Sequence, residues 1–237
     1  MNISKEKVVN EMLSVQEVAR EITEGFVTER EKAVALHDYV RDHIKFGFNR
    51  YFDASSPEYT LKCRLGHCNP KSRLMLALFR ASGLEAKQHF VVIPKVILKG
   101  AVPFAGYVVI PAQVSHSYVD VKIEGIWHTI DSYIIDTDYL KMAQARLQKE
   151  NRNSGYGVRI DSTNIWDGRS DAFSQFDKMS LIEDHNDIED LDAYFHSNRY
   201  KQKVLGIQFN KMFRLMGNWG EAFLNSQITS LRKSTIL

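Results

Sequence analysis

The chain has 237 residues and a formal net charge of +2; 44% of its residues are hydrophobic and 25% are charged. These fractions are typical of a globular protein, and the length suffices for one large domain or for a core with an appended piece. Two cysteines are too few for a disulfide framework, and they could complete a zinc ribbon only with help from histidines.

Charge and hydropathy patterns lead to expectations about partners and localisation. Lys and Arg do not cluster among interleaved aromatic residues, so we expect no nucleic-acid partner. Residues 1–22 are charged throughout and lack an apolar run of the signal-peptide type. The most apolar segment, residues 101–112, is too short to span a bilayer and contains two prolines. We therefore expect a soluble, cytoplasmic protein without a membrane partner.

Two helices are predicted before residue 47. Residues 4–24 carry apolar side chains at helical spacing: Val8, Met12, Val15, Val18 and Ile22. Thr28 and Glu31 form a capping-box pattern, which marks the start of the second helix. Residues 47–66 show no periodicity and contain turn residues, so we predict a long loop there.

A third helix is predicted directly after Cys68. Asn69 is the expected N-cap, Pro70 fits the first helical position, and Gly83 is a suitable C-terminal residue. This helix is apolar on most of its circumference, which indicates a central, buried position. A thiol at the N-terminal end of a helix lies near the positive end of the helix dipole, which favours the thiolate.

The next part of the chain changes to strand-like composition, rich in Val, Ile and aromatic residues. The predicted strands are residues 86–94, 106–113, 116–125 and 126–134. Glu124-Gly125 is predicted to be a tight hairpin turn between the last two. His116 and Asp131 lie at roughly matching distances from that turn, so their side chains are expected to be cross-strand neighbours. Cys68, His116 and Asp131 then form a candidate nucleophile, base and orienting acid.

The last hundred residues are predicted to be mostly helical. We predict a helix after Asp136, a loop with one short strand over residues 152–171, and helical structure from Lys178 onward. An apolar stripe that we interpret as core packing comprises Leu205, Phe209, Met212, Phe213, Met216, Trp219 and Phe223. Helices followed by antiparallel strands indicate an α+β fold. We divide the chain into a core over residues 1–170 and a helical extension over residues 171–237 that packs on it.

Three segments in this order resemble the transglutaminase-like superfamily of papain-fold enzymes: residues 33–48, 65–92 and 115–133. They are similar to the helix ahead of the active site, to the Gly-x-Cys motif with its helix and strand, and to the His and Asp strands. The resemblance implies a helix bearing Cys68 packed on an antiparallel sheet that bears His116 and Asp131, with these three residues as the catalytic triad. Arylamine N-acetyltransferases share this fold and triad, but their usual Gly-Gly pair is missing from "RLGHC".

The resemblance implies cysteine-dependent acyl chemistry without a metal or other cofactor. Cys68 would attack an amide or thioester carbonyl, and an amine or water would resolve the acyl-enzyme. We expect a small or carrier-bound acyl donor, with a carrier protein as a partner. Two alternatives remain open: a cysteine protease or amidase acting on peptide or protein amides, and a non-catalytic binding domain of the same fold.

Further site residues are predicted around this triad. Tyr51 and Tyr59 in the predicted loop, together with Asn49, are candidates for substrate binding or for an oxyanion-hole donor. In residues 94–108, Val102 and Phe104 are expected either to line an acyl-donor pocket or to join the core as a strand connection. Cys63 is interpreted as structural.

Overall fold

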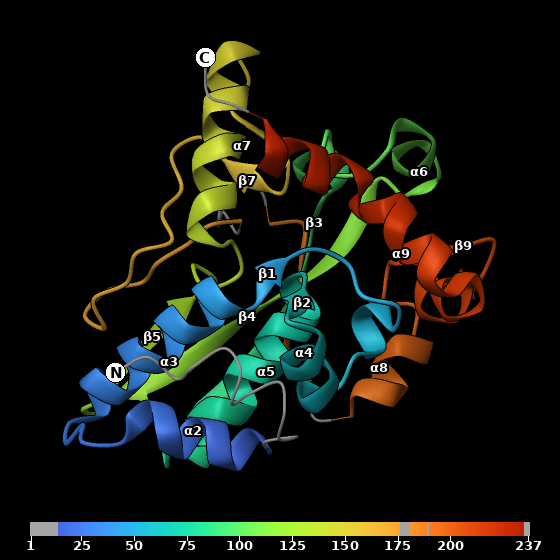
Figure 1. Cartoon of the computed structure of the whole chain (residues 1–237). Helices are drawn as coiled ribbons and strands as arrows, with labels where there is room; N and C mark the ends of the chain where they lie inside the picture. The colour runs from blue at the N-terminus through green and yellow to red at the C-terminus, as the bar shows by residue number, and fades with distance from the viewer. Residues whose placement is uncertain (1–13, 176–180, 189, 235–237) are drawn as a thin grey trace.

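The computed structural model describes residues 14–175, 181–188 and 190–234 (Figure 1). Its central element is an antiparallel sheet with the strand order β5-β4-β3-β8. Helix α5 (Cys68–Ala81) contacts β3 and β4 on one side and helices α2, α3 and α4 on the other. The strands of the sheet are β3 (Ala86–Pro94), β4 (Gln113–Ile123), β5 (Ile126–Ile130) and β8 (Glu183–Asp187). The predicted α+β class and the central cysteine helix are thus confirmed.

The N-terminal helices begin at side-chain caps. Ser14 caps α2 (Val15–Thr23), and Thr28 caps α3 (Glu29–His43), each in a capping box with the glutamate three residues later. The predicted start of the second helix is therefore confirmed. The first predicted helix is confirmed from Val15 onward, whereas Val8 and Met12 lie outside the described residues.

The prediction of a structureless loop over residues 47–66 is wrong. This segment contains a 3-10 turn, η1 (Phe52–Ala54), and helix α4 (Pro57–Cys63). The Ser56 side chain caps α4 and Pro57 opens it, so the local signals for a helix are present. Seven residues make only two turns, which is too short for an apolar period to become visible.

The strand predicted at residues 106–113 is also wrong, because helix α6 (Phe104–Val109) occupies its first half. The valines and aromatic residues of this segment favour strands in general, but Phe104 and Val108 are exposed here, and the segment approaches α9 (Phe209–Lys233) at Gly106. A Cβ atom at Gly106 would lie 3.5 Å from the Phe223 ring of α9. Tertiary packing has overridden the local preference of these residues.

The hairpin prediction is confirmed. Ile123 pairs with Ile126, and Glu124 and Gly125 between them have φ angles of 51° and 85°. Positive φ at both central residues is the requirement of a type I′ turn, and glycine meets it without strain. Short elements that frame this sheet are β1 (Lys45–Phe46), β2 (Leu65–Gly66) and η2 (Lys95–Leu98).

The C-terminal part is more mixed than predicted. Helix α7 (Thr137–Lys149) is confirmed, and the following loop contains two short strands. Among the described residues after 178, β8 pairs with β3 at the edge of the main sheet, so helical structure is not continuous there. Phe209 and Phe213 of the predicted stripe are buried, but Leu205 is 97% exposed and Trp219 is 68% exposed. The remaining elements are β6 (Ser154–Gly155), β7 (Val158–Arg159), α8 (Leu191–His196), β9 (Lys203–Val204) and β10 (Ile207–Gln208).

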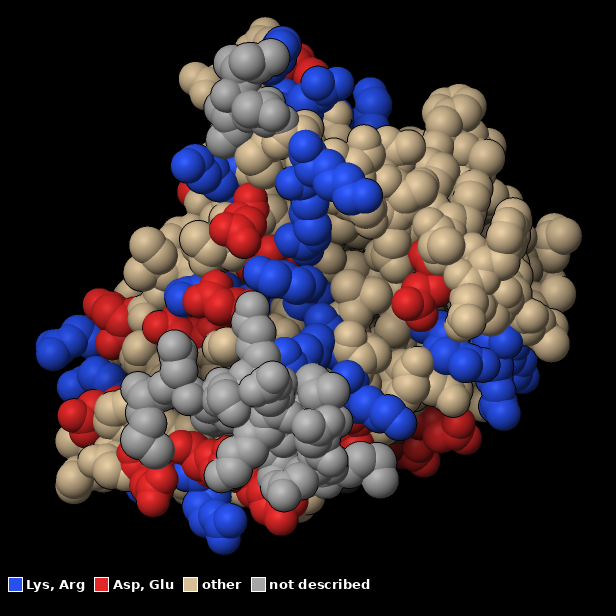
Figure 2. Space-filling view, in the orientation of Figure 1, with Lys and Arg blue, Asp and Glu red and all other residues tan. Residues whose placement is uncertain are grey.

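The molecular surface is unevenly charged. On the face drawn in Figure 2, acidic and basic side chains are mixed over α2 and α3, whereas the surface over α6 is free of both. None of the described helices combines the length and the apolar character that crossing a bilayer requires.

Candidate active site

Cys68 is the first residue of α5, and His67 is the N-cap residue. The prediction of Asn69 as N-cap and Pro70 as first residue is therefore wrong by two positions. Asn69 lies inside the helix, where its amide donates a hydrogen bond of 2.7 Å to the buried Asp53 carboxylate. Pro70 is tolerated as the third helical residue because N–H groups in the first turn have no intrahelical partner. For the same reason, the N–H of Cys68 is available to a ligand.

His116 and Asp131 are joined by their side chains, with His116 Nε2 3.2 Å from Asp131 Oδ2. His116 lies in β4, and Asp131 follows the last residue of β5. The strand register pairs Val119 with Ile130, so the two residues are offset by two positions from direct opposition. Diagonal neighbours at this offset are still within reach of long side chains. Both residues are buried, with 2% and 0% of their surface exposed.

Asp131 is held from its other side by residues 172–175. The backbone N–H groups of Ser174 and Gln175 both donate to the Asp131 carboxylate, and the Ser174 hydroxyl donates to the same group. Ala172 forms a parallel bridge with Ile130 and accepts the backbone N–H of Asp131. These contacts fix the carboxylate behind His116. Sequence reasoning missed them because a β-bridge to a loop leaves no periodic signal.

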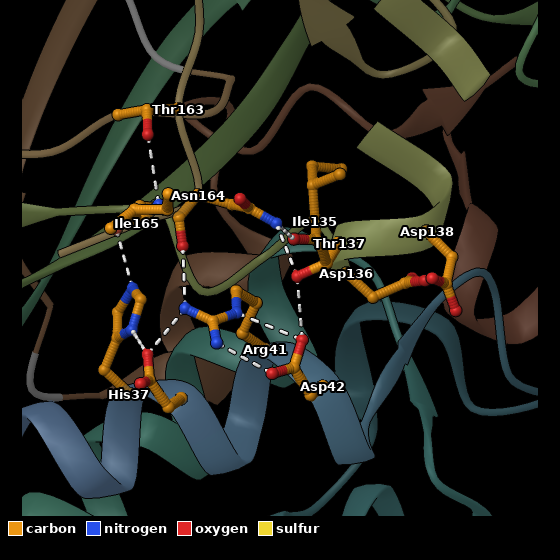
Figure 3. A network of polar contacts seen from close by, with 12 residues as sticks. His37, Arg41, Asp42, Ile135, Asp136, Thr137, Asp138, Thr163, Asn164 and Ile165 are labelled. Atoms are coloured by element: carbon orange, nitrogen blue, oxygen red, sulfur yellow. Dashed lines mark hydrogen bonds and ion pairs between the residues drawn. The ribbon is translucent and has the colours of Figure 1, made fainter. Parts of the chain in front are cut away.

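A polar network fixes the segment that follows Asp131. The buried His37 of α3 bonds Ser132 Oγ through Nε2 at 2.8 Å, and burial lowers the pKa of its imidazole. Figure 3 shows Arg41, also in α3, between Asp42 and the backbone carbonyl of Asn164. The Asn164 amide donates in turn to the carbonyl of Ile135. Helix α3 therefore supports the end of the sheet at which Asp131 lies.

Cys68 and His116 line the same cavity, which has a volume of about 280 Å³. Val102 also lines it and is buried, as expected for an acyl-pocket residue. Phe104 does not line the cavity, because its side chain is 82% exposed on the outer side of α6. Tyr51 and Tyr59 lie outside the lining as well and contact each other edge to face at 4.5 Å. Neither the pocket position of Phe104 nor direct contact of the tyrosines with this cavity agrees with the structure.

The electrostatic environment of Cys68 differs from the predicted one. Burial raises the pKa of the Cys68 thiol well above its ordinary value, and the nearby Asp53 carboxylate raises it further. The backbone N–H groups of Ser117 and Asn69 hydrogen-bond to the sulfur and act in the opposite direction, but they are the smaller influence. Burial and Asp53 therefore oppose the stabilisation of the thiolate that was expected from the helix N-terminus.

A second histidine–carboxylate pair lies beside the thiol. His67 Nε2 is 2.6 Å from Asp53 Oδ1, and His67 lines the same cavity as Cys68. The Tyr200 hydroxyl also donates to the Asp53 carboxylate, although it is 147 residues away in sequence. The sequence patterns singled out neither His67 nor Asp53. Only the spacing of His67 next to Cys68 could have drawn attention to this pair.

Other candidate ligand groups lie apart from the cavity. Cys63 places its sulfur 3.4 Å from the Leu65 carbonyl, and it forms no metal-binding group with His67 and Cys68 in the described part of the chain. The amide of Asn49 donates to Ser55 and to the carbonyl of Leu65, which occupies both of its hydrogens. His89, Asp120 and Asp187 have ligand atoms within 4.8 Å of one another, but His89 is already paired with Asp184.

The part of the chain that contains this site is similar to a known family. Residues 16–132 match the family model described as the transglutaminase-like superfamily. The chain belongs to the transglutaminase-like superfamily. The match includes Cys68, His116 and Asp131, and it confirms the family predicted from the three sequence segments. A comparison with curated proteins finds no match.

Solved structures with partial similarity come from two bacteria. A protein provisionally named a cysteine protease, from Cytophaga hutchinsonii, is 18% identical with a TM-score of 0.38, covering 48% of this chain and 35% of its own. A protein provisionally named a protease, from Parabacteroides distasonis, is 14% identical with a TM-score of 0.36, covering 48% of this chain and 22% of its own. This transglutaminase-like chain thus spans about a third of the length of the first protein and about a fifth of the length of the second.

Proposed function

We propose that the protein is a cysteine-dependent enzyme of acyl transfer or amide hydrolysis, with Cys68 as nucleophile, His116 as base and Asp131 as orienting acid. The observation that carries the proposal is the placement of Cys68 and His116 in one cavity wall, with Asp131 directly behind His116 at 3.2 Å. A thiol, an imidazole and a carboxylate in this order are the parts of a nucleophilic triad.

The chemistry follows from the positions of the atoms. The Asp131 carboxylate is bonded to His116 Nε2, so His116 exchanges the proton with Cys68 through Nδ1. As the sulfur attacks the carbonyl carbon, His116 takes the thiol proton and then transfers it to the leaving group. Asp131 stabilises the imidazolium that forms in between. The N–H of Cys68, at the start of α5, supplies one donor to the developing oxyanion.

The raised pKa of the Cys68 thiol is the reason for the role given to His116. Burial disfavours the thiolate, so attack by the sulfur depends on a base that accepts its proton. General-base assistance typically contributes 10²- to 10⁴-fold to a rate. Water or an amine then attacks the acyl-enzyme with the same histidine as base, which gives hydrolysis or transfer. The two classes of acyl donor for the first step, the acylation of Cys68, are a small or carrier-bound acyl group and a peptide amide.

Acyl-enzyme trapping tests the proposal. The protein is mixed with the acetyl thioester of a soluble thiol, and intact-mass and peptide-mapping measurements follow acetylation of each cysteine. We expect acetylation at Cys68, none in Cys68→Ala, and a reduction of about 10²- to 10⁴-fold in His116→Ala. Cys63→Ala is the matched control and should be acetylated at the wild-type rate.

Two outcomes would contradict parts of the assignment. If wild-type Cys68 shows no acylation with thioester or with activated amide donors, the protein is a non-catalytic domain of this fold. If His116→Ala retains its rate and His67→Ala loses it, the His67–Asp53 pair is the base instead. That alternative is specific because His67 Nε2 is also bonded to a buried carboxylate.

A further inference from the structure

The cavity beside Cys68 is built from apolar side chains. Its walls include Ile97 of η2, Ile110 after α6, and Met212 and Phe213 of α9. No Asp, Glu, Lys or Arg within the described ranges lines it. An occupant that fits such walls must itself be apolar, because a polar group enclosed there without a hydrogen-bond partner is strongly disfavoured.

Polar lining groups are gathered at the reactive end and are mostly engaged. The Gln202 side chain bonds both the N–H and the carbonyl of Ser115, the residue before His116. Gln175 donates its amide to the Gly157 carbonyl and its backbone N–H to Asp131, whereas its side-chain Oε1 has no hydrogen-bond partner among the described residues. A peptide would bring several amide groups into the cavity, and these engaged side chains offer few partners for them. A hydrocarbon chain would bring none.

The size of the cavity sets the size of that chain. Its volume is about 280 Å³. An engineered apolar cavity of about 150 Å³ in another protein stays dry and holds benzene, which has six carbons. By proportion, the cavity beside Cys68 holds roughly eight to twelve carbon atoms. A two-carbon acetyl group would leave most of it unfilled.

An apolar surface surrounds the outer side of this cavity. Helix α6 has no buried residue and exposes Phe104 and Val108, which are 82% and 62% exposed. On α9, Trp219 stacks on Phe223, whose ring lies 3.5 Å from the position of a Cβ atom at Gly106 of α6. Figure 2 shows the surface over α6 without acidic or basic side chains. A chain entering between α6 and α9 therefore meets apolar groups from the surface inward.

We propose that this cavity binds an unbranched hydrocarbon acyl chain of medium length, with its carbonyl at Cys68 and its tail between α6 and α9. The inference rests on the proposed function and names the class of its acyl donor: a thioester or ester of such an acid. The Cys68 sulfur forms a new thioester with the acyl carbon, the bond to the leaving thiol or alcohol breaks, and His116 returns the proton to that group. No oxidant or reductant is needed.

Alkylation by N-alkyl iodoacetamides of increasing chain length tests the cavity without turnover. These neutral probes form a carbon–sulfur bond and release iodide, and the rate at Cys63 in the same molecule is the internal control. We expect the rate constant at Cys68 to rise about threefold to fourfold per methylene, up to roughly eight to twelve carbons, and then to level off. A rate at Cys68 that does not depend on chain length would overturn the proposal.

Narrowing the cavity provides a matched pair of variants. A methyl group at Gly106 would make ordinary contacts with Phe223, so Gly106→Ala should preserve the length profile. Gly106→Leu should shift the optimum to chains shorter by about three or four carbons. Ala222→Leu places the same side chain on the exposed side of α9 and should leave the profile unchanged. An unshifted optimum in Gly106→Leu would contradict the placement of the tail.

Binding without chemistry separates this inference from the proposed function. Calorimetry of decanol with Cys68→Ala should show binding, and acetamide-sized analogues should show none. If decanol binds but no thioester acylates wild-type Cys68, the cavity is an apolar binding site. The proposed enzymatic function is then wrong, while the binding of a hydrocarbon chain is supported. If Cys68 is acylated by acetyl thioester but decanol does not bind, the inference fails alone.

Turnover of two donors distinguishes a soluble source of the acyl chain from a bilayer source. One is the decanoyl thioester of a soluble thiol, and the other is didecanoyl phosphatidylcholine mixed into phosphatidylcholine vesicles. Turnover of the thioester alone supports a soluble donor. Turnover of the vesicle ester that falls tenfold or more in Phe104→Ser, with thioester turnover unchanged, supports a bilayer source reached through α6. Turnover of neither, with full acetyl transfer, would contradict the inference.

Discussion

Ser72 of α5 donates a hydrogen bond of 3.1 Å to the backbone carbonyl of Ser117 in β4. Ser72 lies four residues after Cys68, and Ser117 follows His116, so this bond joins the helix of Cys68 directly to the strand of His116. The Ser72 hydroxyl also bonds the Tyr133 hydroxyl at 2.7 Å. All three side chains are buried. The relative position of Cys68 and His116 therefore depends on a small hydroxyl in the core.

Replacing Ser72 with Ala should lower both stability and reactivity. The Tyr133 hydroxyl would lose its buried partner, which typically costs about 1–3 kcal/mol of the free energy of unfolding. Urea unfolding measures this loss, and iodoacetamide alkylation of Cys68 measures the effect on the site. Ser226→Ala is the control, since that hydroxyl bonds the Phe223 carbonyl at an exposed position and should change stability by about 0.5 kcal/mol or less. Equal effects of both substitutions would contradict a role for Ser72 in joining helix and strand.

The substitutions Asp131→Ala and Asp131→Asn should have different effects on melting temperature. Asp131→Ala leaves the N–H groups of Ser174 and Gln175 without their acceptor, so we expect a clear drop in melting temperature along with lost activity. Asp131→Asn keeps one acceptor oxygen but no longer stabilises the imidazolium of His116. It should melt close to wild type while turnover falls by roughly 10³- to 10⁴-fold. Asp161→Asn, at an exposed ion pair with Arg159, should alter neither. Full turnover in Asp131→Asn would exclude Asp131 as the orienting acid.

The two cysteines should differ in how their alkylation depends on pH and on His116. Burial raises the pKa of Cys63 to about 11, so its alkylation should be very slow at pH 7 and rise tenfold per pH unit toward 11. Cys68 also has a raised pKa, but His116 can accept its proton. Mass mapping at pH 7 should show faster alkylation of Cys68, and His116→Ala should remove that difference. Comparable wild-type rates at the two cysteines would argue against base assistance.

Local signals predicted the parts of the fold that depend on neighbours in sequence. The Thr28 capping box, the strand Ala86–Pro94 and the Glu124-Gly125 turn are all present where expected. The contact between His116 and Asp131 also agrees with their similar distances from that turn, because a hairpin keeps the two residues close. The two-residue offset between them was not predictable, since strand register depends on the whole turn.

Features that depend on distant parts of the chain were not predictable. The Asp131 carboxylate is bonded by backbone N–H groups 43 and 44 residues later, and Asp53 by a hydroxyl 147 residues later. Helix α6 has the composition of a strand, and its conformation depends on contact with α9. The raised pKa of Cys68 arises from burial and from the Asp53 carboxylate, whereas the sequence shows only the helix N-terminus.

Lys71 should make stability depend on pH above neutrality. It lies in α5 and is fully buried, with Nζ donating to the carbonyl of Ile44 at 2.5 Å. Burial lowers the pKa of Lys71 to about 7, although the Asp136 carboxylate acts in the opposite direction. In the unfolded chain its pKa returns to about 10.4. Between these values the unfolded state binds more protons, so this residue adds stability as pH rises from 7 to about 10.

Lys71→Met tests this by keeping the length of the side chain and removing the amine. The free energy of unfolding, measured by urea at pH 6 to 9, should favour wild type over the variant increasingly above pH 7, by up to about 1.4 kcal/mol per pH unit. Below pH 7 the difference should stay constant, because Lys71 is then charged in both states. Lys62→Met, at an exposed position of α4, should show no such trend. A difference between wild type and Lys71→Met that is the same at pH 6 and pH 9 would mean that the amine stays charged in the core.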